Sequence, residues 1–420
     1  MNMGFLSPNP FSDASYISKM MVFFFFTLFV LHQENVVHLG EAQAVSGSNF
    51  IKTSGKVFMR NGRPVYFNGF NAYWLMTQAS NPSHRGNVTS VFQEAMKNGM
   101  TVSRTWAFSD GGQFPLQISP GVYNQDMLKG LDFVISEAAK YRIYLILSLV
   151  NNYPDFGGRN QYVQWAKERG QQLKSTDDFY TCPTTKGYYK NHIKTILERK
   201  NSITGVAYKD DPIIFAWELM NEPRCETDLS GKILQDWIKE MATYVKSIDS
   251  NHLLEIGLEG FYGESKKEQN PNGYMFGTDF VSNNLIAEID FTTIHAYPDA
   301  WFPGSDDQTQ LKFVQKWLQV HIEDSNEILK KPLLFTEFGK SSNISGYNIM
   351  RRDTYYDTVY NDIYTSAKSG GACKGALFWQ ALNQGMNDLC DGYEVILVEC
   401  NSTAKIIAQQ SQKLSDLSRG

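Results

Sequence analysis

Eight short apolar runs that alternate with helix-like segments constrain the fold of this chain more than any other feature of its sequence. The strand-like runs occupy residues 65–70, 101–107, 144–150, 213–217, 253–257, 291–296, 333–336 and 376–379. The amphipathic segments between them occupy residues 90–98, 126–141, 188–199, 234–248, 310–323 and 354–368. Alternation of strands and helices indicates parallel pairing through helical crossovers, and eight such units close a sheet into a barrel. We therefore expect an α/β fold, a (β/α)8 or TIM barrel, as a single domain over residues 45–420 with loop insertions on its C-terminal rim. The widest interval, after the third run, leaves room for an insertion containing GGRNQYVQW.

The first 44 residues are excluded from this domain because they carry a targeting pattern. A run of 12 apolar residues, MMVFFFFTLFVL, follows Lys19 and precedes the small-residue site Ala42-Gln43-Ala44. Such a run is too short to span a bilayer comfortably, so the pattern predicts a secretory signal peptide that is removed near Ala44. An uncleaved membrane anchor is the alternative. We expect a secreted, extracellular protein without membrane association after signal removal, and Asn87, Asn343 and Asn401 head candidate glycosylation sequons.

Five cysteines form an odd set, so at least one thiol is free in a secreted chain. Cys373 precedes an apolar run and is expected to be buried and reduced. Cys390 with Cys400, and Cys182 with Cys225, are the expected disulfide pairs. The sequence contains no Cys-x-x-Cys motif and no histidine cluster, so we expect neither a metal site nor a cofactor.

Two carboxylates stand at the ends of two strand-like runs. Glu222 closes the segment IIFAWELMNEPR at 213–224, and Glu337 closes KPLLFTEFGK at 331–340. Pro223 ends the first strand and biases Glu222 towards extended geometry. An isolated glutamate of this kind is usually a solvated loop acid. A second acid at the same rim of a parallel barrel instead suits glycoside hydrolysis, in which one carboxyl protonates the leaving oxygen and the other attacks the anomeric carbon.

Further motifs extend this pattern into a family resemblance. They are RTWAFSDG, LVNNYPDFGGRNQYVQWA, HAYPDAW and FWQ, which accompany WELMNEP and TEFG in this order. Together they resemble the retaining enzymes of glycoside hydrolase family 5, and within it the plant endo-β-1,4-mannanases, from about residue 50 to the C-terminus. The resemblance implies endo-acting, retaining hydrolysis of β-1,4-mannosidic linkages in mannan, glucomannan or galactomannan of the plant cell wall.

The resemblance and the required chemistry assign a role to each polar candidate. Glu222 is the expected general acid/base and Glu337 the expected nucleophile. Arg104 and Tyr297 are expected to keep Glu337 ionised. The resemblance assigns Asn221 to the sugar 2-hydroxyl and His295 to orienting the acid/base. The competing structural interpretations are a salt bridge for Arg104, a turn residue for Asn221 and a hydrogen-bonded core histidine for His295.

Tryptophans supply the expected apolar surfaces of the site. Trp379 is the expected floor of the sugar site, since a flat indole suits the apolar face of a pyranose. Trp74, Trp106 and Trp165 are candidates for further subsites, although each could belong to the core, as we expect for Trp317. Asn151 and Asn152 stand where related cellulases often carry a histidine, a departure that favours mannan over cellulose as the substrate.

The sequence leaves several functions open. A β-1,4-glucanase or a mannan transglycosylase would use the same fold and acids, and a carbohydrate-binding barrel without catalysis is a third possibility. Presence of all the expected catalytic residues argues against the third. The formal net charge is −5 and no basic stripe occurs, so we expect no nucleic-acid partner. We expect a monomer that binds polysaccharide.

Overall fold

Eight parallel strands form the central sheet in the computed structural model, which describes residues 49–419. They run in the order β10-β9-β8-β5-β4-β13-β12-β11, so each strand pairs with its neighbour in the barrel sequence. Their bounds are Phe67–Asn71 (β4), Val102–Trp106 (β5), Tyr144–Ser148 (β8), Ile214–Glu218 (β9), Leu253–Glu255 (β10), Thr292–Ala296 (β11), Leu333–Phe338 (β12) and Cys373–Phe378 (β13). All eight predicted strands are confirmed. The predicted signal peptide lies outside the described residues.

Hydrogen bonds join the two ends of this strand order. The Asp290 N–H donates to the Leu254 carbonyl, and the His295 N–H donates to the Glu259 carbonyl, both at 2.9 Å. These bonds link β10 and its following loop to β11. The predicted (β/α)8 barrel is therefore confirmed.

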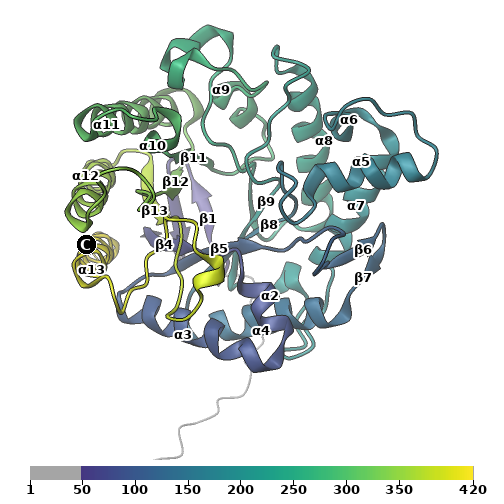
Figure 1. The fold of residues 1–420 in the computed structure, drawn as a ribbon, viewed down its shortest axis with the longest axis horizontal. Coiled ribbons are helices and arrows are strands. Elements are labelled where there is room, and N and C mark those ends of the chain that lie inside the picture. The colour runs from purple at the N-terminus through teal and green to yellow at the C-terminus, as the bar shows by residue number, and fades with distance from the viewer. Residues whose placement is uncertain (1–48, 420) are drawn as a thin grey trace, which may run out of the picture. The chain divides into compact units, whose positions relative to one another are not determined.

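Helices surround the strands (Figure 1). The six predicted helices correspond to Arg85–Lys97 (α3), Gln125–Tyr141 (α4), Pro183–Leu197 (α7), Lys232–Ile248 (α8), Asp307–Asp324 (α11) and Ile349–Lys368 (α12). Elements that the sequence did not predict are Leu75–Ser80 (α2), Gly158–Glu168 (α5), Asp178–Thr181 (α6), Phe280–Asn284 (α9), Pro298–Trp301 (α10), Asn401–Arg419 (α13) and the hairpin Gln117–Ser119 (β6) with Val122–Tyr123 (β7). The predicted insertion after the third barrel strand forms α5 and α6.

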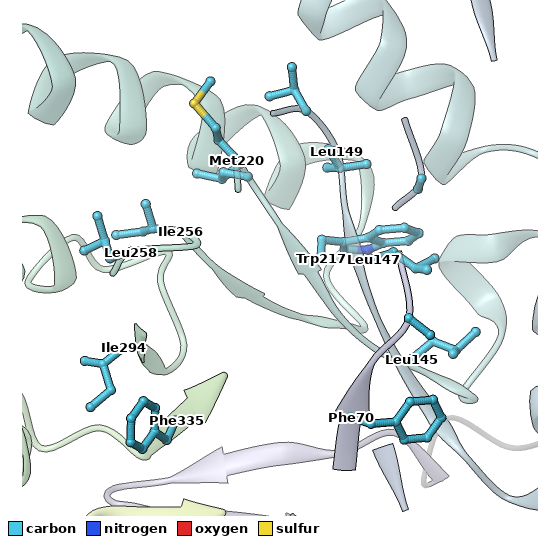
Figure 2. Packing of buried hydrophobic residues seen from close by; sticks show 14 of the residues in the cluster. Phe70, Leu145, Leu147, Leu149, Trp217, Met220, Ile256, Leu258, Ile294 and Phe335 are labelled. Atoms are coloured by element: carbon cyan, nitrogen blue, oxygen red, sulfur yellow. The ribbon is translucent and has the colours of Figure 1, made fainter. Parts of the chain in front are cut away.

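Alternation along the strands divides the core into two layers. Leu145 and Leu147 of β8 face the helices together with Trp217 of β9, and Figure 2 shows part of this outer cluster. Ile146 of β8 belongs instead to a smaller cluster inside the barrel, with Phe215 of β9. Successive side chains of a strand point to opposite faces, so strands that are buried on both faces read as continuous apolar runs.

An N-terminal sheet closes the inner cluster. Strands Lys52–Ser54 (β1), Val57–Arg60 (β2) and Arg63–Val65 (β3) pair antiparallel and precede β4. Phe58 of β2 packs edge-to-face against Phe67, Phe215 and Phe291, with ring centroids 5.3–5.5 Å apart. The apolar run at residues 65–70 predicts Val65 as part of the first barrel strand, but Val65 ends β3, and the barrel strand begins at Phe67.

The cysteine pairs expected from the sequence are absent. All five cysteines lie within residues 49–419 and are free. The thiols engage different neighbours: Cys225 lies 3.7 Å from Thr227 Oγ1, Cys390 contacts Glu394 and Cys400 contacts Arg352. The expectation that Cys373 is buried and reduced is confirmed. In the part of the chain that the structure describes, no helix has the length and apolar character needed to cross a membrane.

Candidate active site

Arg104 is the centre of the site at the C-terminal ends of the strands. Its side chain is fully buried and donates five hydrogen bonds. Two go to Glu218 at 2.5 and 2.7 Å, and the others go to Glu337 at 2.5 Å, Asn221 at 2.7 Å and Asn71 at 3.0 Å. The expected salt bridge to Glu337 is present, but Glu218 also holds the guanidinium through two hydrogen bonds, a pairing that the sequence does not predict.

The two candidate carboxylates lie close together. The Tyr297 hydroxyl donates to Glu337 Oε2 at 2.6 Å, and His295 Nδ1 lies 2.6 Å from Glu222 Oε1. One oxygen of Glu222, one oxygen of Glu337 and one ring nitrogen of His295 all lie within 4.8 Å of one another. The barrel therefore brings together two acids that are far apart in the sequence, and each acid has its own hydrogen-bonding neighbour on β11 or just beyond it.

The backbone at Glu222 differs from the sequence expectation. Its φ is +51°, in the left-handed region, and not in the extended region that Pro223 favours. The Glu222 N–H donates to the Gly257 carbonyl at 2.9 Å, and Asn221 forms a bridge with Asn151. These tertiary bonds hold the turn, so they override the local preference of a residue before proline.

Burial raises the pKa of Glu222, an effect that the charge of Arg224 opposes. Burial also raises the pKa of Glu337, while His295, Arg104 and the Tyr297 hydrogen bond lower it. Burial lowers the pKa of His295, an effect that the charge of Glu337 opposes. Two neighbouring carboxylates do not both ionise readily, and Glu337 has the ion pair and the hydroxyl donor. The shared proton is therefore best placed on Glu222.

Asn221 and Asn151 form a second hydrogen-bonded unit beside the acids. Asn221 Oδ1 accepts from Arg104, and Asn221 Nδ2 donates to Asn151 Oδ1 at 2.9 Å. Asn151 Nδ2 donates to the Asp155 carbonyl. The second Nδ2–H of Asn221 is available to a ligand, because an amide nitrogen carries two donors.

A cleft of about 560 Å³ opens above these groups. Aromatic side chains form one wall: Tyr73 stacks on Trp379 at 5.8 Å between centroids, and Trp106 lies 6.1 Å from Trp379. Trp106, Asn151, Asn221, Glu222, Tyr297, Glu337 and Trp379 all line the cleft, whereas Arg104 and His295 are fully buried. The cleft thus combines flat apolar surfaces with paired acids, which suits a pyranose ring.

Two of the three tryptophans considered for further subsites lie in the core, the alternative that the sequence left open. Trp74 is fully buried and its Nε1–H donates to the Ala381 carbonyl. Trp165 is buried on α5 and packs edge-to-face on Tyr162. Both rings belong to the outer cluster, Trp74 at the residue before α2 and Trp165 within α5. The expectation that Trp317 is a core residue is confirmed.

The cleft also contains residues to which the sequence assigns no role. Arg224 donates to both oxygens of Glu259 at 2.6 and 2.8 Å, and burial together with the charge of Glu222 raises the pKa of Glu259 to about 7. Asp391 accepts from Trp379 Nε1 at 2.6 Å. Further lining residues are Tyr73, Tyr153, Asp155, Phe156, Ala300, Trp301 and Tyr393. Glu259 followed a predicted strand, but Asp391 stands in an irregular segment without a sequence signal.

Within residues 49–419, one group of side chains has the donor types of a metal site: Glu222, His295 and Glu337. Both oxygens of Glu337 already accept hydrogen bonds from Arg104 and Tyr297. A guanidinium beside a carboxylate favours an acid–base site over a cation site at this position.

Comparisons with known proteins agree with this geometry. A family model described as GH family 5 beta-mannosidase-like matches residues 48–387. Mannan endo-1,4-beta-mannosidase 4 of Solanum lycopersicum is 59% identical over 376 residues, 90% of this chain and 94% of the relative. Mannan endo-1,4-beta-mannosidase 7 of Arabidopsis thaliana is 53% identical over 400 residues, 94% of this chain and 92% of the relative.

Solved structures of two endo-mannanases also resemble this chain. The endo-beta-1,4-mannanase from Thermotoga petrophila aligns with a TM-score of 0.73 at 30% identity, covering 84% of this chain and 78% of that one. The endo-1,4-beta-mannanase from Rhizomucor miehei aligns with a TM-score of 0.71 at 32% identity, covering 87% and 99%.

Proposed function

Because this chain belongs to the beta-mannosidase-like proteins of glycoside hydrolase family 5, we propose that it hydrolyses β-1,4-linked mannans within the polymer and with retention. The approach of Glu222 to Glu337 carries the proposal. One oxygen of Glu222 lies within 4.8 Å of one oxygen of Glu337, an approach close enough for the carboxyl separation of roughly 5–5.5 Å in retaining enzymes.

In the proposed mechanism, Glu337 attacks the anomeric carbon while Glu222 protonates the leaving oxygen. A covalent glycosyl-enzyme forms, and water activated by Glu222 then releases the sugar. Arg104 and Tyr297 stabilise the ionised form of Glu337, and His295 orients Glu222. The amide of Asn221 donates to the sugar 2-hydroxyl, a contact that strengthens in the transition state. Trp379 supports the sugar ring, with Trp106 and Asn151 on neighbouring parts of the cleft.

Size analysis of the products from galactomannan, glucomannan and carboxymethylcellulose tests this proposal. We expect both mannans to yield medium-length oligosaccharides while carboxymethylcellulose stays intact. Glu337→Gln and Glu222→Gln should each lower kcat by at least about 10⁴-fold. Glu323→Gln, at an exposed position of α11, is the matched control and should retain full activity.

Each other outcome identifies one competing function. Equal cleavage of carboxymethylcellulose would indicate a glucanase. Products longer than an added manno-oligosaccharide would indicate a transglycosylase. Binding of mannan without any cleavage would indicate a carbohydrate-binding barrel and refute the proposal.

We also propose that the protein is secreted to the extracellular cell wall as a monomer. The apolar run at residues 20–31 and the site Ala42-Gln43-Ala44 support secretion. N-terminal sequencing of protein from the culture medium should start near residue 45, and recovery of the intact chain with membranes would contradict it. Light scattering measures the molar mass in solution, and the mass of a single chain would support the monomer.

A further inference from the structure

Two glutamates stand side by side beneath the proposed catalytic groups. Glu218 of β9 and Glu255 of β10 are paired in register on neighbouring strands, and both side chains are fully buried. Glu218 engages the Arg104 guanidinium through two hydrogen bonds. The carboxyl groups of Glu218 and Glu255 lie within hydrogen-bonding reach of each other. A hydrogen bond between them requires a proton, because an ionised carboxylate is only an acceptor.

The surroundings of Glu255 show which oxygen carries that proton. Its Oε2 accepts from the Gly257 N–H and from the Thr293 hydroxyl. Its Oε1 is buried and receives no hydrogen bond from any donor in the described chain. A buried acceptor without a donor is costly, whereas an O–H at this position satisfies both glutamates at once.

The charges around the pair favour the same arrangement. Arg104 donates to both Glu218 and Glu337, and its charge also acts on Glu255, while burial lowers the pKa of the neighbouring His295. Glu222 and the Glu259–Arg224 pair lie further towards the cleft. Burial and the neighbouring Glu218 raise the pKa of Glu255 well above its usual range. Burial also raises the pKa of Glu218, but Arg104 more than offsets this and lowers it.

We propose that Glu255 is a neutral positioning residue whose O–H donates to Glu218, so that Glu218 alone supplies the charge that aligns Arg104 with Glu337 and Asn221. This assignment rests on the proposed function for its kinetic consequences. Glu255 then holds Glu218 in place from the neighbouring strand β10, as a buried carboxylic acid that does not line the cleft.

Three variants test the assignment. Glu255→Gln keeps a donor towards Glu218 and an acceptor for Gly257, so kcat/KM should stay within about threefold of the wild type. Glu218→Gln removes the charged partner of Arg104, so kcat/KM should fall by about tenfold to a hundredfold. Glu255→Leu removes both the donor and the acceptor, so its kcat/KM should fall as that of Glu218→Gln does. Rescue of kcat/KM by Gln and not by Leu separates hydrogen bonding from packing.

The pH profile distinguishes a neutral from an ionised Glu255. The acid limb of kcat/KM reports ionisation of Glu337 in the free enzyme. Glu218→Gln removes a negative charge near Glu337, which lowers the pKa of Glu337 and moves this limb to lower pH. A neutral Glu255 predicts no movement in Glu255→Gln. A shift to lower pH in Glu255→Gln as large as that in Glu218→Gln would overturn the proposal.

An infrared measurement tests the proton without any use of activity. The difference spectrum of wild type minus Glu255→Gln at neutral pH should contain the carbonyl band of a protonated carboxylic acid. A carboxylate band in its place would overturn the proposal. A protein that shows the acid band but cleaves no mannan would refute the proposed function and leave this protonation intact.

Discussion

Arg104 Nη1 lies 2.5 Å from Glu337 Oε1, although 233 residues separate the two in the sequence. The remaining donors of the same guanidinium reach Glu218, Asn221 and Asn71. Burial lowers the pKa of Arg104, but the Glu218 and Glu337 carboxylates more than offset this and raise it. Arg104 therefore stays charged, and its rigid fork sets the mutual position of the proposed nucleophile and the amide that precedes the proposed acid/base.

Tyr297→Phe should weaken the proposed nucleophile. The substitution removes the hydroxyl that donates to Glu337 Oε2 at 2.6 Å. We expect kcat/KM to fall roughly 10- to 150-fold, because a hydrogen bond to a charged group contributes about 1.5–3 kcal/mol. Loss of the donor raises the pKa of Glu337, so the acid limb of the pH profile should move to higher pH.

Tyr393→Phe is the matched control for this variant. Tyr393 lines the same cleft and packs against the Tyr297 ring, but its hydroxyl donates to Asp299. The acid limb of the kcat/KM profile should stay at the wild-type pH in Tyr393→Phe. An unmoved acid limb in Tyr297→Phe would show that this hydroxyl does not stabilise the ionised form of Glu337.

Trp379→Ala should lower activity, whereas Trp74→Ala should lower stability. Trp379 lines the cleft, so its loss should lower kcat/KM at least about tenfold through lost stacking, with little change in stability. Trp74 is fully buried, so its loss should cost about 3–5 kcal/mol of unfolding free energy. Urea denaturation and kinetics on the same samples check both. A stable Trp74→Ala variant with reduced affinity for mannan would restore Trp74 as a binding residue.

Phe58→Ala should destabilise the barrel without altering the chemistry. Phe58 fills the inner cluster against Phe67, Phe215 and Phe291, so the truncation should cost about 3–5 kcal/mol. Phe114→Ala is the control, because 64% of that side chain is exposed. Chemical denaturation measures the difference, and kcat of the folded variant should match the wild type. Equal stability of the two variants would mean that β1–β3 contribute little to the barrel.

Asp110→Asn should reduce the pH dependence of stability. Asp110 is fully buried, its Oδ1 accepts from Gln117, and burial raises its pKa to about 8. The unfolded chain releases this proton at about pH 4, whereas the folded protein holds it up to about pH 8. The unfolded state therefore binds fewer protons across this window, and stability falls as pH rises through it.

Urea midpoints at pH 5 and pH 8 check this prediction. The wild type should lose more stability between the two values than Asp110→Asn does. Asp416→Asn, at an exposed position near the end of α13, is the control and should follow the wild type. Identical slopes for wild type and Asp110→Asn would show that Asp110 is already ionised at pH 5.

Local patterns determined the barrel and the location of its chemistry. The eight strands were predictable because each is buried on both faces and therefore reads as an unbroken apolar run. Glu222 and Glu337 were predictable because parallel strands in a barrel end at one rim. The N-terminal strands β1–β3 escaped prediction, since these strands are short and their residues are partly polar and partly exposed.

Side-chain direction at the strand ends required the tertiary structure. Trp74 and Trp106 both follow or close a predicted strand, yet Trp74 packs in the core and Trp106 lines the cleft. The left-handed turn at Glu222 opposes the local preference set by Pro223, and it depends on a bond to Gly257.

The sequence by itself determined which residue types reach the rim, because hydrophobic periodicity and strand ends are properties of a few neighbouring residues. Only the tertiary structure decided their partners. Arg104 donates to Glu218, Glu255 lies beside Glu218 on the neighbouring strand, and Trp379 donates to Asp391. Each of these pairings joins separate strands or loops. Its energy depends on burial and on the distance between groups, and neither quantity is present in a local pattern.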